Sequence, residues 1–309
     1  MDLLLYIALF AVSLLALLKA SDWFVDSAEE IGLSLGIPPF IIGVTIVAFG
    51  TSLPELATSI ASVFAGDSKI VVGNVVGSNV TNIALVLGLT AVVVKEIKLE
   101  TNIWHVDMPF LWGSAFLMWL TLLDQHFSIF EAVLFLLGIA LFLAYSFKEH
   151  QGESAMRTKA SVKSYLMLIV GGVLVWLGAD YTILAITKIS AMMGISSEII
   201  AQTAVALGTS LPEIIVSLNA ARKGKTSIAV GNVLGSNIFN TYLVMAVPSF
   251  FGVLEIPDNV IHFSIPVMVV MTILFGITSN NKNISRWEGC MLLLFYLFYF
   301  VETFRANNF

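Results

Sequence analysis

Residues Gly50–Glu55 read GTSLPE within the apolar run IIGVTIVAFGTSLPELATSIASVFA, and the same six letters return at Gly208–Glu213 within IIAQTAVALGTSLPEIIVSLNAA. Proline lacks the backbone N–H of a helix interior and clashes with the carbonyl four residues earlier, while glycine relaxes the backbone beside it. Each copy therefore predicts a broken helix with a carboxylate at the break, in hydrophobic surroundings.

The composition indicates a lipid environment. Of the 309 residues, 58% are hydrophobic and 12% are charged, and the mean hydropathy is +0.93. A water-soluble domain carries much less apolar surface, so we interpret the chain as an all-α integral membrane protein. The net charge of -6 is small and scattered, which argues against nucleic acid as a partner.

A helix needs roughly 20 apolar residues to cross a bilayer, and by that rule the chain divides into about ten segments. The polar stretch 148–163 separates a first half, residues 1–147, from a second half, residues 164–309, and we interpret it as a linker. The predicted segments are Leu3–Leu18, Phe40–Phe64, Ile70–Val94, Met108–Leu123, Phe127–Phe147, Ser164–Ile189, Ile199–Ala221, Ser227–Phe251, Ile261–Thr278 and Trp287–Val301.

Basic residues predict the orientation of the bundle. When alternate loops are grouped, all Lys and Arg residues except Lys69, Lys188 and Arg305 fall on one side. Because Lys and Arg are retained in the cytoplasm, the linker is expected to be cytoplasmic and both termini extracellular.

The two halves repeat each other. An offset of 158 positions aligns Glu55 with Glu213 and VVGNVVGSNVTN with AVGNVLGSNIFN, without a gap. About five spans lie between equivalent points, and an odd number means that the two copies cross the membrane in opposite directions. The sequence therefore predicts two inverted-topology repeats of five helices, the arrangement in which secondary transporters bind ions at broken helices.

The repeated residues supply oxygen atoms. An acid inside the membrane is a functional-site hypothesis by default, and the breaks add carbonyl groups and the hydroxyls of Thr51, Ser52, Thr209 and Ser210. Ser78 and Asn82 are four residues apart, as are Ser236 and Asn240, so each pair shares a helix face. Hard cations such as Na⁺ and Ca²⁺ prefer all-oxygen ligands. Taken alone, serines, threonines and GxxxG spacings in membrane helices more often serve helix packing than ion binding. A glutamate repeated at two helix breaks inside the membrane more often has a functional role.

GTSLPE followed by GN-x-x-GSN-x-x-N, twice in an inverted repeat, resembles the sodium/calcium exchanger family, and the length resembles its compact prokaryotic members. The resemblance implies that Glu55 and Glu213 bind the central Ca²⁺ and share Na⁺, with Asn82 beside them. It also implies that backbone or hydroxyl oxygens of both repeats form flanking cation sites. These residues are Ala48, Thr51, Ser52 and Ser78 in the first repeat and Ala206, Thr209, Ser210 and Ser236 in the second.

One residue departs from that pattern, since Asn240 stands where well-studied members carry Asp. A potassium requirement is therefore not expected. The resemblance implies an exchange of three Na⁺ for one Ca²⁺, whereas the two glutamate charges alone would balance one Ca²⁺ but not three Na⁺. We expect a non-enzymatic antiporter in the cell membrane, without a cofactor and functional as a monomer. A Ca²⁺/H⁺ exchanger of the same fold and a cation channel remain the alternatives.

Overall fold

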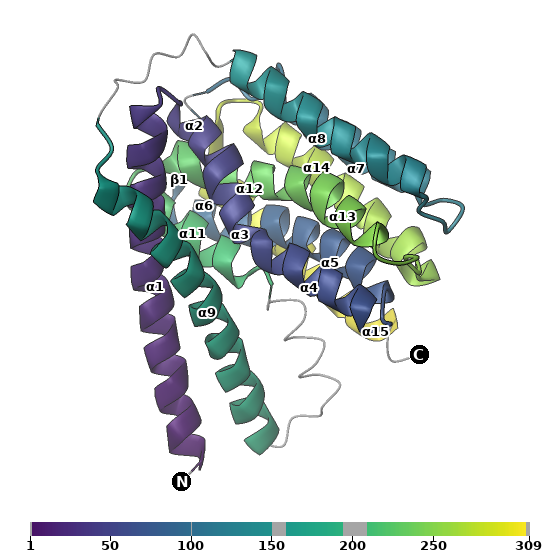
Figure 1. Ribbon diagram of the computed structural model, residues 1–309, viewed down its shortest axis with the longest axis horizontal. Coiled ribbons are helices and arrows are strands. Elements are labelled where there is room, and N and C mark those ends of the chain that lie inside the picture. Colours follow the sequence, from purple (N-terminus) through teal and green to yellow (C-terminus); the bar gives the residue numbers. More distant parts are fainter. Residues whose placement is uncertain (1, 100, 150–158, 194–208, 307–309) are drawn as a thin grey trace.

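A computed structural model describes residues 2–99, 101–149, 159–193 and 209–306 (Figure 1). The regular structure of these residues is helical apart from one short antiparallel ribbon, which the sequence did not predict and which pairs Ile97 with Ile284. The elements, with π-helical segments marked η, are α1 (Asp2–Ser34), α2 (Pro39–Ile42), η1 (Gly43–Val47), α3 (Ala48–Thr51), α4 (Leu53–Phe64), α5 (Lys69–Val80), η2 (Thr81–Leu87), α6 (Gly88–Val94), β1 (Glu96–Lys98), α7 (Asp107–Thr121), α8 (Ile129–Glu149), α9 (Val162–Met192), α11 (Leu211–Arg222), α12 (Thr226–Phe239), η4 (Asn240–Val244), α13 (Met245–Ser249), η5 (Val260–Ser264), α14 (Ile265–Ser279), β2 (Asn283–Ser285) and α15 (Arg286–Ala306).

Among the described residues, seven helices are long and apolar enough to cross a membrane. They are Leu3–Ser34, Pro39–Phe64, Lys69–Val94, Ile129–Glu149, Val162–Met192, Thr226–Ser249 and Val260–Ser279. The remaining predicted segments overlap α7, α11 and α15, and residues 199–208 of one of them lie outside the described part. The membrane-spanning all-α class is therefore confirmed.

The predicted end of the first span at Leu18 is wrong, because α1 continues to Ser34. The amide of Asn219 on α11 donates to the carbonyl of Leu18 at 3.1 Å and to the hydroxyl of Ser21 at 2.9 Å. Polar residues thus continue α1 as a helix by pairing with a neighbouring helix, which a hydropathy rule does not anticipate.

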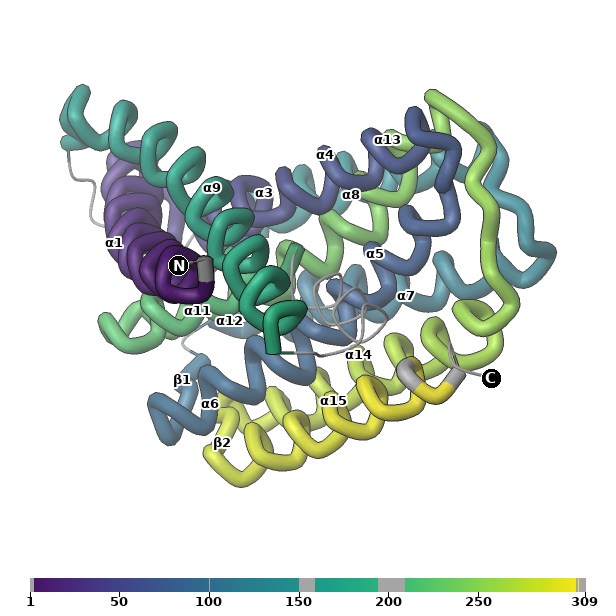
Figure 2. The backbone as a smooth tube through the Cα atoms, turned by 90° about the horizontal axis from the view of Figure 1, so that it is seen from below, coloured from purple at the N-terminus to yellow at the C-terminus, as the bar shows by residue number. Residues whose placement is uncertain are grey.

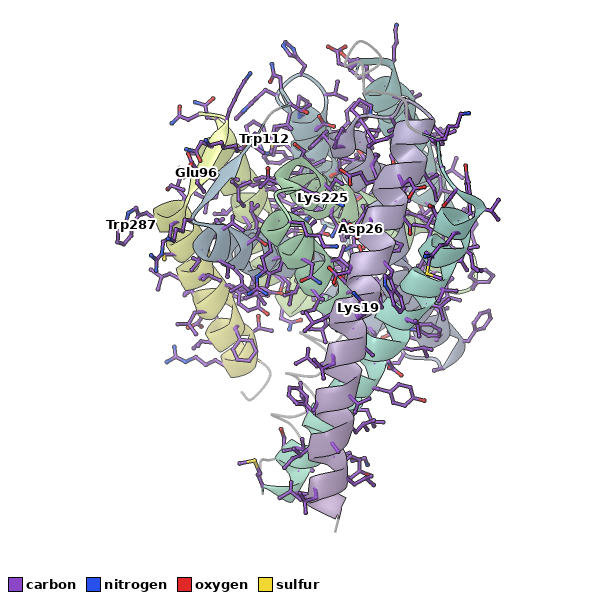
Figure 3. All side chains as sticks on the ribbon, turned by 90° about the vertical axis from the view of Figure 1, so that its left-hand side faces the viewer. Lys19, Asp26, Glu96, Trp112, Lys225 and Trp287 are labelled. Carbon is purple, nitrogen blue, oxygen red and sulfur yellow. The ribbon has the colours of Figure 1, made fainter. Side chains whose placement is uncertain are left out.

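Two lysines after α11 extend this contact. Lys223 Nζ lies 2.9 Å from carboxylate oxygens of both Asp22 and Asp26, and Lys225 Nζ lies 2.5 Å from Asp26 and 2.7 Å from Glu29. Figure 3 shows Asp26, on α1, next to Lys225. Partial burial lowers the pKa of Lys223, but its hydrogen bonds with Asp26 and Asp22 outweigh this and raise the pKa above its usual value. Lys223 is therefore charged at neutral pH.

The helices form a central group with a pair on one side. In Figure 1, α1 and α9 pack together and extend beyond the other helices, and the hydroxyl of Thr182 on α9 donates to that of Ser13 on α1 at 2.9 Å. Figure 2 shows α5 and α12 between a layer that contains α3 and α4 and a layer that contains α14 and α15, with α11 beside α12 and next to α1. The centre of the molecule thus consists of the helices that carry the repeated motifs.

The predicted helix break is present in the first repeat. The backbone of Ser52 has φ −86° and ψ 0°, and α4 begins directly after it with Pro54 in its first turn. Ser210 has nearly the same backbone, φ −88° and ψ 0°, and α11 begins after it with Pro212 in the first turn. Proline suits the first turn because no helical acceptor needs its missing N–H there. Each proline therefore starts a new half-helix.

Helix α12 packs directly on the broken segment, with every residue from Ser227 to Phe239 buried. A Cβ atom at Gly231 would overlap the carbonyl oxygen of Phe40 and the nitrogen of Val44, and one at Gly235 would overlap the carbonyl oxygen of Val44. These glycines therefore allow two backbones to touch, as expected from their GxxxG spacing.

Gly231→Ala is expected to destabilise the protein by about 1–3 kcal/mol, because its methyl group meets backbone atoms that cannot move aside. The matched control is Gly113→Ala on α7, where no described heavy atom lies within 4 Å of the added carbon. Thermal unfolding in detergent, followed by tryptophan fluorescence, measures both. Equal unfolding temperatures for the two variants would contradict the close packing of α12.

Candidate cation-binding site

Glu55 and Glu213 are fully buried and lie near each other. Each lies in the first turn of its half-helix, where the helix dipole favours a negative charge. Within the described part of the chain, none of their four carboxylate oxygens has a hydrogen-bond partner. Two buried carboxylates without donors are costly, so this point of the fold favours a positive charge.

Hydroxyl groups from the opposite repeat lie beside each carboxylate. Thr209 of the second repeat lies near Glu55, and Thr51 and Ser52 of the first repeat lie near Glu213, but the carboxylate oxygens are beyond hydrogen-bond distance. Ser52 and Ser210 are buried, and neither hydroxyl has a hydrogen-bond partner among the described residues. The two predicted sets of site residues therefore form one cluster.

Two asparagines connect the repeats in mirrored positions. Thr51 Oγ1 donates to Asn232 Oδ1 at 3.1 Å and lies 3.4 Å from the hydroxyl of Ser236. In the other half of the cluster, Thr209 Oγ1 donates to Asn74 Oδ1 at 3.1 Å and lies 3.3 Å from the hydroxyl of Ser78. The predicted hydroxyls therefore come together in pairs that cross the boundary between repeats.

The sequence prediction did not include Asn74 and Asn232. The signal that identifies them is the GN pair that opens GN-x-x-GSN-x-x-N in both copies. Both side chains are buried, and both belong to hydrogen bonds between the repeats.

Asn82 and Asn240 are fully buried, and the described residues offer no hydrogen-bond partner to any polar atom of their side chains. Asn82 is the second residue of η2 and Asn240 is the first residue of η4, so both lie where α-helix changes to π-helix. The backbone N–H of Asn240 still bonds to the carbonyl of Ser236. The four-residue spacing is therefore kept, and π-helical turns are frequent at functional sites.

Of the two predicted backbone ligands, Ala48 and Ala206, the structure describes only Ala48. Ala48 is buried, and its carbonyl oxygen accepts from the N–H of Ser52 at 3.0 Å and lies 3.3 Å from the hydroxyl oxygen of Thr51. Ala206 lies outside the described residues.

The cluster combines two negative charges with neutral amide, hydroxyl and carbonyl oxygens. Buried polar atoms normally have partners, and among the described residues the repeated glutamates, serines and asparagines all keep unpaired polar atoms. Oxygen ligands without thiolate or imidazole fit hard cations better than transition metals. The residues present therefore fit a divalent cation, or several monovalent ones, as cargo.

Comparison with known proteins identifies the family. The family model described as sodium/calcium exchanger protein matches residues 5–148 and 163–304. The sodium/calcium exchanger MaX1 of Methanosarcina acetivorans is 34% identical over 95% of this chain and 97% of that protein. The inner membrane protein YrbG of Escherichia coli is 30% identical over 94% of both chains.

A solved structure of the sodium-calcium exchanger NCX_Mj, soaked with 2.5 mM Na⁺ and 0.1 mM Sr²⁺, superposes with a TM-score of 0.84. It is 33% identical in sequence and covers 96% of this chain and 98% of that chain. Since the matches extend over almost the full length and agree with the paired GTSLPE motifs, the chain belongs to the sodium/calcium exchanger family.

Proposed function

We propose that this membrane protein exchanges Na⁺ for Ca²⁺ by alternating access to one central site. The observation that carries the proposal is the pair of buried carboxylates of Glu55 and Glu213, which have no hydrogen-bond partner among the described residues and lie where two half-helices begin. Two negative charges balance one Ca²⁺, and the same oxygens suit Na⁺. Because both ions need these carboxylates, the site holds one kind of cargo at a time, and this couples the two fluxes.

The proposed ligands form a central group and two flanking groups. The central group consists of the two glutamates with the amide oxygens of Asn82 and Asn240. The flanking groups consist of backbone or hydroxyl oxygens of Ala48, Thr51, Ser52 and Ser78, and of Ala206, Thr209, Ser210 and Ser236. The crossed contacts between Thr51 and Asn232 and between Thr209 and Asn74 support a site made jointly by the two repeats.

We take the two repeats together to span the membrane about ten times and to have opposite orientations in it. Two such repeats can open the shared site to one side of the membrane and then to the other, which is alternating access. The mirrored hydrogen bonds of the site and the matching backbone of Ser52 and Ser210 support this arrangement. The family match falls into two parts, 5–148 and 163–304, which supports two halves joined by a linker, and we take that linker to be cytoplasmic. We also propose that both termini are extracellular and that one chain suffices for transport.

The two alternative functions fit less well. A Ca²⁺/H⁺ exchanger is not favoured, because the family description and the MaX1 relative name sodium with calcium. A channel needs a continuous path, whereas both glutamates here are fully buried.

In proteoliposomes, ⁴⁵Ca²⁺ uptake is expected to require Na⁺ on the opposite side and to stop when choline replaces that Na⁺. A pH gradient without Na⁺ is expected to give no comparable uptake, and K⁺ is expected to be dispensable because Asn240 carries no charge. Strong proton-driven uptake in the absence of Na⁺ would instead support the Ca²⁺/H⁺ exchanger.

Glu55→Gln and Glu213→Gln are each expected to abolish Na⁺-driven ⁴⁵Ca²⁺ flux, because each removes a full charge from a desolvated divalent ion. Asn82→Ala and Asn240→Ala are expected to weaken flux less, since water can replace a neutral oxygen. Initial rates are compared at matched amounts of reconstituted protein. Near-normal flux in either glutamine variant is incompatible with the proposed site.

Single cysteines at Asp67 and Arg222, in a Cys290→Ser background, are expected to react from opposite sides of the membrane. Both positions are exposed, and they lie at the ends of equivalent half-helices: Asp67 follows α4, and Arg222 is the last residue of α11. A membrane-impermeant maleimide should reach Asp67→Cys from outside and Arg222→Cys from the cytoplasm. Labelling of both from the same side would exclude inverted repeats.

A further inference from the structure

Asn74 and Asn232 have no charge and do not belong to the proposed ligands, yet both occupy mirrored buried positions beside ligands of the opposite repeat. Their amide groups are held in one orientation by serines of their own repeats. Asn74 Nδ2 donates to Ser59 Oγ at 3.1 Å and to the carbonyl of Glu55 at 3.2 Å, and Asn232 Nδ2 donates to Ser217 Oγ at 2.9 Å.

This orientation determines what each amide offers to the site. An asparagine has one donor side and one acceptor side, so fixing the NH₂ group also fixes the oxygen. In both clusters the acceptor oxygen points to a threonine of the other repeat, Thr209 for Asn74 and Thr51 for Asn232. Each amide oxygen therefore accepts a hydrogen bond from a threonine hydroxyl.

A hydroxyl has one proton and two lone pairs, and a cation can bind only at the lone pairs. A proton directed at the amide leaves the lone pairs of Thr51 and Thr209 free for an ion. Without the amide, the proton has competing acceptors close by, such as the carbonyl of Ala48 at 3.3 Å from Thr51, or the carboxylate beside each threonine. A hydroxyl that donates to that carboxylate competes with the ion for the same negative charge.

We propose that Asn74 and Asn232 are positioning residues that make the hydroxyls of Thr209 and Thr51 into cation acceptors, so that each repeat orients a ligand of the other. The inference rests on the proposed function, because it takes both threonines as ligands. Its effect falls mainly on Na⁺: a monovalent ion gains less from the two carboxylates than Ca²⁺ does and depends more on neutral oxygens.

The test measures Na⁺-driven ⁴⁵Ca²⁺ flux in proteoliposomes over a range of Na⁺ and Ca²⁺ concentrations. Asn74→Leu keeps a similar volume and removes the acceptor. It is expected to raise the half-saturating Na⁺ concentration about tenfold, which corresponds to the free energy of one lost hydrogen bond. The half-saturating Ca²⁺ concentration is expected to rise by less than about threefold. Asn74→Asp keeps an acceptor oxygen for Thr209 and is expected to leave the Na⁺ value unraised.

Asn79→Leu is the matched control. Asn79 lies on the same helix and is equally buried, but it donates to Thr241 at 2.8 Å and not to a proposed ligand. It is expected to leave the half-saturating Na⁺ concentration unchanged, even where it reduces the amount of folded protein. A similar rise in the control would show a general packing effect and overturn the inference.

A double variant separates orientation from other effects. If Asn74 acts through the hydroxyl of Thr209, then Asn74→Leu combined with Thr209→Val should have the same half-saturating Na⁺ concentration as Thr209→Val alone. Additive effects, no rise in Asn74→Leu, or a rise in Asn74→Asp would overturn the inference. Where Asn74→Leu does not fold, Asn232→Leu with Thr51→Val gives the same comparison in the mirrored cluster.

Failure of the proposed ligand set gives a different result. If Thr209→Val and Thr51→Val both leave the Na⁺ dependence unchanged, the threonines are not ligands and the proposed set itself is wrong. If they raise the half-saturating Na⁺ concentration and the asparagine variants do not, the set stands and the positioning role alone is rejected.

Discussion

Two buried carboxylates to which the described part of the chain offers no hydrogen-bond donor are the constraint on which the rest of the structure depends. The side chains of Glu55 and Glu213 are fully buried and lie near each other. A fold keeps such groups only where other features offset their cost. Here the half-helices place a dipole behind each carboxylate, and the cation that we propose as cargo supplies the missing charge.

The surrounding packing holds the two half-helices in place. Gly231 and Gly235 let α12 touch the backbone of the broken helix, so the first repeat is anchored directly to the second. The crossed bonds from Thr51 to Asn232 and from Thr209 to Asn74 join the repeats again at the level of the carboxylates. A change in either repeat is therefore transmitted to the ligands of the other.

The symmetry of the sequence is not kept everywhere in the fold. Asn219, Lys223 and Lys225 bind α1, whereas the aligned positions of the first repeat are Ala61, Ala65 and Asp67. The aligned residues cannot make equivalent bonds to α9, because two are alanines and the third has the opposite charge. The bonds between α1 and the end of α11 therefore distinguish one side of the molecule from the other.

The sequence by itself determined the membrane environment, the repeat, the two breaks and most candidate ligands, because apolar length, Pro-Glu pairs and an exact offset are local or periodic signals. Tertiary structure alone decided which hydroxyl lies beside which carboxylate, and it revealed Asn74 and Asn232 as the residues that join the repeats. It also extended α1 to Ser34, since the partners of that polar stretch are about 200 positions away in the chain. Contacts between distant segments depend on how helices pack, and no local pattern of residues specifies that.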